Sequence, residues 1–414
     1  MKARPMKYSK ADSEIPYLPA FRLRLRPAWS RLPMTGSFRS LLTQTPLGGA
    51  LGRNANNIDL FRLIAACLVI YGHAFGLAPE PGSQDLLMRW TGYPSAGMAV
   101  KLFFFLSGLL VTNSLMHKRS ASHFLIARFF RIWPALALVL VVSALVIGPL
   151  CTTLDLKSYF SEPNTYLYIK RFLLMETWGK KQFGYYNLPG LFTDNPHRNT
   201  VNASLWSLGV EVYAYLFLVA VFLVGMLEKR VATALIVLVL LDSVLPFRIL
   251  FIFLPRGFED FSYLPFCFGS GAFMALHKDS IRISIGMPLV FILLFYLFHG
   301  TQYARYFFYL IVFTGVLYLA ICQWVKNIRL PADVSYGVFL WGFPIQQTLV
   351  HYFPGMGLLT NQVVATVLAI GCGTASWFLV EKRAIEFGKK LSRRLDAHAS
   401  QWPGNAVDRE PASS

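Results

Sequence analysis

Charged residues are scarce in this 414-residue chain: Asp, Glu, Lys and Arg together make up 14% of it, against about 25% in soluble domains. Acidic residues are the rarest of them, with 21 Asp and Glu against 39 Lys and Arg. Hydrophobic residues reach 55%. These proportions exclude an ordinary soluble enzyme and indicate a polytopic membrane protein.

Cysteine is also rare. The five cysteines have neither paired nor metal-ligand spacing, and most of them lie in apolar runs, which is typical of small core residues. We expect no disulfide framework, no metal site and no tightly bound cofactor.

The apolar runs predict an all-α fold, an integral membrane bundle of about ten transmembrane helices. The predicted spans are 58–78, 97–116, 132–150, 205–227, 231–246, 261–277, 286–299, 304–325, 334–353 and 361–381. The stretch 165–178 carries Lys170, Arg171 and Glu176, and is more typical of an amphipathic surface helix.

The net charge of +18 does not indicate nucleic-acid binding, because Lys and Arg crowd the tails and alternate loops. This asymmetry predicts that both termini are cytoplasmic and that 151–204 is an extracytoplasmic loop. We expect a mobile basic arm over 1–57, a membrane domain over 58–390 and a polar cytoplasmic tail over 391–414. The arm lacks the apolar region of a secretory signal and is attracted to anionic lipid; a transit peptide of similar composition stays open.

Two basic side chains interrupt the first predicted span, where ionisable residues are costly and mark a functional path. Arg62 and His73 are eleven residues apart, which is three turns plus about 20°, so they share a face about 16 Å apart. Asp59, three residues before Arg62, is a supporting ion-pair partner. The alternatives are an arginine that snorkels to the interface and a histidine satisfied within the bundle.

The segment RFFRIWP brings Arg128 and Arg131 one turn apart at the predicted cytoplasmic mouth. Such a pair can clamp phosphates bidentately. Ordinary positive charge on a cytoplasmic loop is the alternative.

The segment NASLWSLGVE places Glu211 six residues into the fourth predicted span. Since this span starts outside, we expect Glu211 at the depth of His73, as its acid–base partner. Asn202, Trp206 and Lys101 are the candidate substrate-binding residues at the outer end.

Two further residues are candidates for support. Ser107, beside Gly108, permits close helix approach. Trp341 precedes Pro344, which we expect to kink its helix and free carbonyls to line a cavity.

Together these motifs resemble the membrane-bound acyltransferase 3 family, whose members O-acetylate surface polysaccharides, lipopolysaccharide and related glycans. The matching motifs are Arg62-x10-His73, FFFLSG (103–108), RFFR (128–131), SLWSLGVE (204–211), SYGVFLW (335–341) and SWFLVEK (376–382). The order and spacing of the first, third and fourth motifs are the specific part of the match.

The resemblance implies acetyl-CoA as donor, a glycan or lipid-linked glycan as acceptor, and a bacterial inner membrane. It matches His73 and Arg62 to the essential first-span pair, Arg128 and Arg131 to the family's RxxR pair, and Glu211 to the acid after the SLW motif. His73 then either deprotonates the acceptor or carries the acetyl group. A transporter or flippase and a structural subunit of a glycan assembly complex are the alternatives. The acyl group and the oligomeric state stay open.

Overall fold

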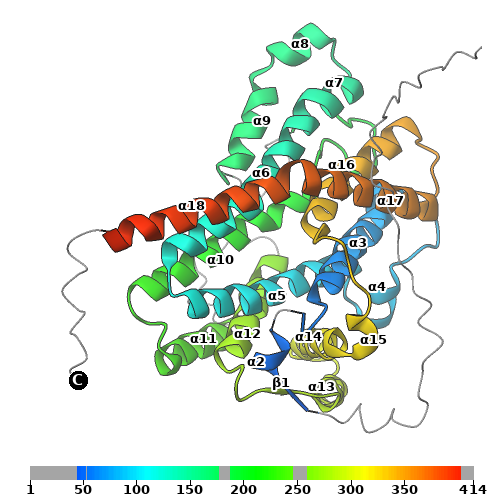
Figure 1. The fold of residues 1–414 in the computed structure, drawn as a ribbon. Helices are drawn as coiled ribbons and strands as arrows, with labels where there is room; N and C mark the ends of the chain where they lie inside the picture. The colour runs from blue at the N-terminus through cyan, green and yellow to red at the C-terminus, as the bar shows by residue number, and fades with distance from the viewer. Residues whose placement is uncertain (1–43, 53, 177–186, 246–258, 402–414) are drawn as a thin grey trace, which may run out of the picture. The chain divides into compact units, whose positions relative to one another are not determined.

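The structure is a computed structural model, and it describes residues 44–52, 54–176, 187–245 and 259–401. Most of the predicted basic arm and the end of the predicted C-terminal tail lie outside the described residues. Within these ranges the chain is almost entirely helical (Figure 1). Strands β1 (Thr45–Pro46) and β2 (Arg282–Ile283) pair antiparallel, and no other strand occurs in the described ranges.

Most of the helices are α-helical, with π turns at η2 and η6 and 3-10 turns at η4 and η5. In chain order they are α2 (Leu47–Ala50), α3 (Ile58–Leu77), α4 (Leu86–Thr91), α5 (Ser95–Lys118), α6 (Ala121–Val142), η2 (Ser143–Ile147), α7 (Gly148–Cys151), α8 (Leu156–Ser161), α9 (Pro163–Leu173), η4 (Ala203–Leu205), α10 (Trp206–Leu223), α11 (Lys229–Val244), η5 (Glu259–Tyr263), α12 (Leu264–Leu276), α13 (Gly286–Leu297), α14 (Ala304–Ile321), α15 (Gln323–Lys326), α16 (Ser335–Tyr352), α17 (Leu358–Ser376), η6 (Trp377–Glu381) and α18 (Lys382–Gln401).

Apolar helices long enough to cross a membrane recur along the chain. The six stretches that meet both conditions are Ile58–Leu77, Ser95–Lys118, Ala121–Cys151, Ala203–Leu223, Ala304–Ile321 and Leu358–Leu395. The other predicted spans correspond to α11, α12, α13 and α16, which are helical but shorter or less apolar. The chain is a multi-pass, all-α membrane protein, while ten spans and cytoplasmic termini stay predictions.

Two predicted spans belong to longer helices, each continued through a π turn, a feature that often occurs at functional sites. The span predicted to start at 132 belongs to a helix that begins at Ala121, so the RFFR motif lies in the same helix as that span. The helix predicted to end at 381 continues through η6 into α18, which lies against α6 (Figure 1). The predicted domain boundary at 390 therefore falls inside a helix.

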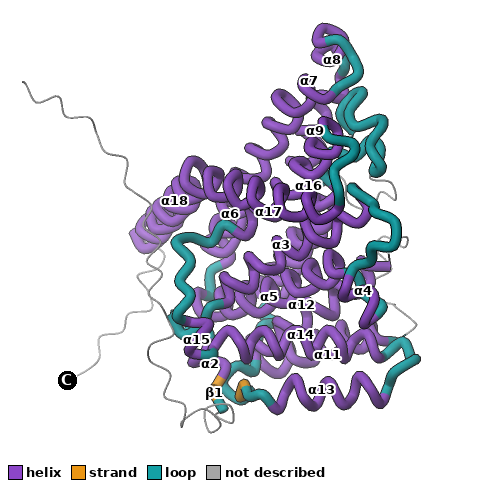
Figure 2. Tube along the Cα trace, turned by 90° about the vertical axis from the view of Figure 1, so that its right-hand side faces the viewer, coloured by secondary structure: helices purple, strands orange, loops and turns teal. Residues whose placement is uncertain are grey.

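Glycines let the central helices approach backbone to backbone. A Cβ at Gly108 of α5 would clash with the carbonyl of Phe268 in α12, and one at Gly271 of α12 would clash with the carbonyl of Phe105. The close approach predicted beside Ser107 is confirmed. Figure 2 shows that the axes of α5, α12, α14 and α13 lie roughly parallel to one another.

Helix directions define two ends of the bundle. Gly72 of α3 abuts Ala96 near the start of α5, where a Cβ on Gly72 would lie 2.7 Å from the Ala96 nitrogen, so the two helices are antiparallel. Helix α16 runs parallel to α3, because Asp333, just before α16, contacts Arg62 near the start of α3, whereas Gly342 and Gln346 contact Ile70 farther along. We call the end where α3 begins the Arg62 end, and the opposite end the His73 end.

The loop 187–202 descends along α16 before α10 begins. At the His73 end Asn195 donates to the side-chain oxygen of Gln347 at 2.7 Å, and farther down Asn202 donates to the carbonyl of Leu340 at 2.9 Å. Leu340 is twelve residues from the end of α16 at Tyr352, which is about 18 Å along the axis. Irregular backbone can lie this deep because it is buried in protein.

Pro344 explains where the loop attaches. Proline has no N–H, so the carbonyl four residues earlier, that of Leu340, loses its helical donor. The Asn202 amide supplies the missing bond. The freed carbonyl was predicted to line a cavity, but it holds a loop instead.

Removing the side-chain amide of Asn202 should destabilise the fold only in a chain that carries Pro344. We expect Asn202→Ala to lower the free energy of unfolding by about 1–3 kcal/mol, because a buried carbonyl loses its partner. In a Pro344→Ala background the restored N–H should make the same change nearly neutral. Unfolding in detergent titrations measures this cycle, with the exposed Asp194→Ala of the same loop as control. Equal losses in both backgrounds would contradict it.

Candidate functional site

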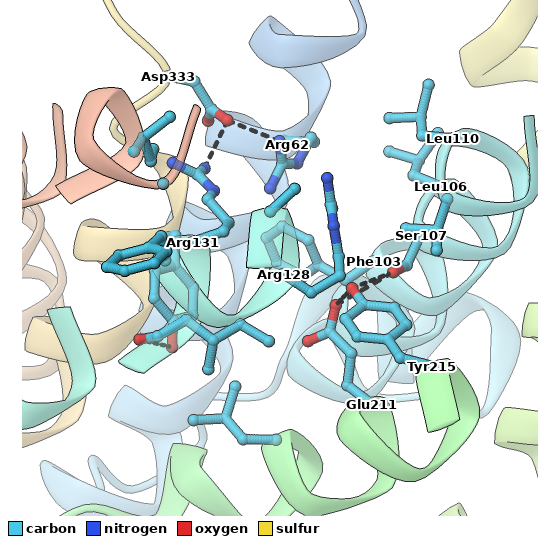
Figure 3. A pocket seen from close by; sticks show the side chains of 18 of the residues that line it. Arg62, Phe103, Leu106, Ser107, Leu110, Arg128, Arg131, Glu211, Tyr215 and Asp333 are labelled. Atoms are coloured by element: carbon cyan, nitrogen blue, oxygen red, sulfur yellow. Dashed lines mark hydrogen bonds and ion pairs between the residues drawn. The ribbon is translucent and has the colours of Figure 1, made fainter. Parts of the chain in front are cut away.

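A cavity of about 810 Å³ lies at the Arg62 end, enclosed by α3, α5, α6, α10, α16 and α18 (Figure 3). Its cationic lining residues are Arg62, Lys118, Arg128, Arg131, Lys389 and Arg393, and its carboxylates are Glu211 and Asp333. Aromatic and aliphatic side chains of α5 and α16, including Phe103 and Phe339, form the rest of the wall. The site therefore combines a large excess of positive charge with an apolar surface.

Asp333, just before α16, joins two of the arginines. Its Oδ2 atom accepts from Arg62 at 2.6 Å and from Arg131 at 2.5 Å, and all three side chains are less than a quarter exposed. Burial acts to raise the pKa of Asp333, but the charges of Arg62 and Arg131 outweigh it and lower the pKa to about 2. This bridge ties α3, α6 and α16 together.

Arg131 is held on several further sides. Its guanidinium lies 3.5 Å from the buried carboxylate of Glu381 in η6, and over the rings of Tyr336 and Trp377. Glu381 in turn accepts from Ser376 at 2.9 Å. Arg131 therefore links α6 to Asp333, just before α16, and to Glu381 in η6.

Arg128 is placed differently. It makes no ion pair or hydrogen bond with any residue that the structure describes, and Figure 3 shows its side chain extending into the cavity beside Arg62. The same lack of a carboxylate partner within the described ranges holds for Lys118, Lys389 and Arg393. These four cations can bind an incoming anion without breaking an existing pair.

Glu211 is held by hydroxyl groups on the opposite wall. Its Oε1 atom accepts from Ser107 at 3.1 Å and from the Tyr215 hydroxyl, and these two hydroxyls lie 2.7 Å apart (Figure 3). Ser107 is therefore brought to the site, as predicted for a supporting residue, but through a hydrogen bond as well as by close helix approach.

His73 lies at the opposite end and does not line the cavity. Its ring meets the Phe343 ring edge-on at 5.1 Å, and the ring of His197 from the descending loop meets Phe343 at 5.6 Å. The Nδ1 atom of His73 is buried without a hydrogen-bond partner.

The predicted pairing of Glu211 with His73 is wrong. His73 lies at the level of Ala96 in α5, whereas Glu211 contacts Ser107, eleven residues or about 16 Å farther along that helix. The prediction assumed that α10 starts at the membrane surface. Because the loop first descends to Leu340, Glu211 reaches the Arg62 end instead.

The three predicted substrate-binding residues also lie outside the cavity lining. Asn202 is buried in the bond that anchors the loop. Trp206 packs edge-on against Phe261 at 5.0 Å, and Lys101 is buried with its ammonium 6.0 Å from the Tyr309 ring.

Of the two other predicted supports, Asp59 stays close to Arg62, at 3.9 Å, but its side chain is 59% exposed. Trp341 is buried in α16, and its indole nitrogen has no partner among the described residues.

Several cavity residues were not predicted. Lys389 and Arg393 were assigned to the end of the membrane domain and to the polar tail, although 382–401 has the basic, amphipathic pattern of a helix that lies on another surface. Asp333 stands directly before the SYGVFLW motif, which was the available signal for it. Tyr215 follows Glu211 by one helical turn, the spacing at which side chains meet.

Comparison with known proteins gives one family and two relatives. An acyltransferase domain family matches residues 55–381. The chain is 28% identical over 342 residues to an O-acetyl transferase of Shigella phage Sf6, covering 80% of this chain and 96% of that protein. It is 34% identical over 175 residues to Nodulation protein 10 of Rhizobium leguminosarum bv. viciae, covering 39% of this chain and 43% of that protein. No solved structure matches the chain.

The Asp333 bridge should dominate the stability of this end. Asp333→Asn leaves two largely enclosed arginines without their shared carboxylate, and we expect it to lower the free energy of unfolding by about 3 kcal/mol, the lower end of the range for buried pairs. Because the pKa of Asp333 is lowered in the folded state, the wild type should lose this contribution as the pH falls from about 4 to about 2, and the variant should not.

The matched control is Asp59→Asn, which alters an exposed pair to the same arginine and should cost less than about 1 kcal/mol. Thermal unfolding in detergent at several pH values measures both variants. Equal stability of the two variants would contradict the assigned role of Asp333.

Proposed function

The chain belongs to the acyltransferase family whose domain matches residues 55–381, and we propose that it is a membrane-embedded O-acetyltransferase. In this proposal it moves an acetyl group from acetyl-CoA on the cytoplasmic side of a bacterial inner membrane to a hydroxyl of a surface or exported glycan. One observation carries the proposal: side chains of motifs scattered over the family match converge on a single basic cavity.

The donor is the ligand that this cavity suits best. Coenzyme A carries phosphates on its adenosine end and a long, uncharged pantetheine arm. Unpartnered cations such as Arg128 and Lys389 favour the phosphates, and the wall beside Phe103 favours the arm. Arg62 and Arg131 are engaged by Asp333, so their main part is to shape the site. This assigns the phosphates chiefly to Arg128, where the sequence had suggested the Arg128–Arg131 pair.

The arm would extend from the cavity toward His73. The cavity reaches Val100 of α5, four residues or about 6 Å short of the level of Ala96 and His73. The rings of Phe103 and Phe339, 5.8 Å apart, stand in this part of the wall. We propose that the arm passes beside this aromatic pair, so that the thioester arrives at the imidazole.

His73 then acts as the group that receives the acetyl or deprotonates the acceptor. Glu211, held by Ser107 and Tyr215 in the donor cavity, cannot orient the imidazole directly. We assign to it a role beside Arg128, limiting the positive charge that faces the bound donor.

The overall reaction is tested by comparing surface glycan from a wild-type strain and a gene-deletion strain by proton NMR. O-acetyl signals should vanish on deletion and return on complementation. Purified protein with the glycan from the deletion strain should release free coenzyme A. A transporter or a purely structural subunit would release none, and that result would overturn the proposal.

His73→Ala should reduce acetyl transfer by about 10²- to 10⁴-fold while leaving folded protein in the membrane, because an acid–base or nucleophilic group is lost. The matched control is His299→Ala, an exposed histidine between α13 and α14. Coenzyme A release per mole of folded protein measures both. Full activity of His73→Ala would refute its chemical role.

Arg128→Gln should raise the Kd for acetyl-CoA about 10- to 100-fold, since a charge-assisted hydrogen bond is worth about 1.5–3 kcal/mol. Its thermal stability should be unchanged, because Arg128 has no partner within the described structure. Arg131→Gln should instead lower stability, since Asp333 and Glu381 lose a shared cation. Titration calorimetry and thermal unfolding separate the two. An acetyl-CoA Kd indifferent to Arg128 would refute the phosphate site.

A further inference from the structure

A second imidazole lies near His73. His197 belongs to the descending loop, and its ring packs edge-on against Phe343, the residue whose ring also meets His73. The two ring-centroid distances to Phe343 are 5.6 Å for His197 and 5.1 Å for His73. One aromatic side chain of α16 therefore positions both imidazoles at the His73 end.

The backbone that carries His197 is fixed by a buried glutamine. Gln347 donates from its side-chain nitrogen to the carbonyls of His197 at 2.7 Å and Thr200 at 2.6 Å. Asn195 donates to the side-chain and main-chain oxygens of the same glutamine. The side-chain oxygen and nitrogen of Gln347 therefore bond to this loop alone. A buried polar group with all its bonds satisfied in this way fixes the position of the loop.

The two histidines differ in exposure. His73 is mostly enclosed, with an unpartnered Nδ1 atom, whereas the His197 side chain is open to the exterior. Partial burial lowers the pKa of His197, against a backbone hydrogen bond that raises it, so its ring is neutral at pH 7 and able to accept a proton. His197 is the more exposed of the two imidazoles and so the more accessible to an acceptor from the exterior.

Resting on the proposed function, we propose that His197 is the base that deprotonates the acceptor hydroxyl while the acetyl group is carried by His73. The reason is chemical. Acetylation of one ring nitrogen withdraws electron density from the ring and leaves the other nitrogen a very weak base, so the second half of the reaction needs another base.

The first step takes place with the donor. A ring nitrogen of His73 bonds to the thioester carbon, the carbon–sulfur bond breaks with its electron pair on sulfur, and the thiolate takes up the proton that the ring loses. In the second step the acceptor oxygen bonds to the acetyl carbon and the carbon–nitrogen bond breaks. The hydroxyl proton passes to His197 and from there restores the proton of His73.

The two steps can be separated with purified wild-type protein and acetyl-labelled acetyl-CoA. Without acceptor, wild type should release one equivalent of coenzyme A in a burst and retain the label, and His73→Ala should do neither. Adding glycan isolated from the deletion strain should discharge the label. His197→Gln should keep the burst and the acetyl-CoA Kd, but discharge the label about 10²- to 10⁴-fold more slowly.

The matched control is His351→Gln, a histidine of α16 on the same side of the bundle that packs on Phe192 rather than Phe343. It should behave as wild type in both steps. His197→Gly supplies a second test, because added imidazole should restore its discharge rate, as free base can replace a missing base but cannot repair a misplaced loop.

Three results would overturn the inference: wild-type discharge in His197→Gln, loss of the burst together with the discharge, or an active wild type that never retains label. In each of these the wild type still acetylates glycan, so the proposed function stands. A wild type that transfers no acetyl group at all would instead defeat the proposed function.

Discussion

A single carboxylate shared by two arginines is the constraint on which the Arg62 end depends. Asp333 neutralises part of the charge of Arg62 and Arg131 and fixes α3 and α6 against the start of α16. Without it, these two largely enclosed guanidinium groups would repel each other across a site where water screens charge only in part. Because those two are engaged, the remaining cations of the cavity keep their full attraction for an anionic ligand.

The second constraint is the missing N–H of Pro344. It leaves one carbonyl of α16 unpaired deep in the bundle, and the loop that satisfies it carries polar backbone far below the end of that helix. The start of α10, and hence the place of Glu211, follows from this attachment. A proline and an asparagine that are more than a hundred residues apart in sequence thus decide at which end an acidic side chain lies.

Much of the fold was predictable, because apolar runs of sufficient length become helices whatever surrounds them. Arg62 was found by the cost of placing charge inside such a run, and Arg128 by its spacing of one turn from Arg131. The depth of Glu211 was not predictable, since counting residues from a span boundary presumes that loops stay at the surface. Lys389 was assigned to the membrane domain but not to the site, because a pattern of charges marks an amphipathic helix without saying which surface it covers. Helix propensity and hydropathy are local, whereas these placements depend on contacts between distant segments.

The aromatic pair of Phe103 and Phe339 has a consequence for the membrane itself. A protein with a water-accessible basic hollow at one end and an exposed imidazole at the other is close to being a leak for protons and small ions. The two rings, 5.8 Å apart, line the cavity wall on the way toward His73, and passing an apolar wall is costly for a hydrated ion but not for a slender uncharged arm. In the proposed reaction, this apolar wall would admit the uncharged arm that carries the thioester while it holds back hydrated ions.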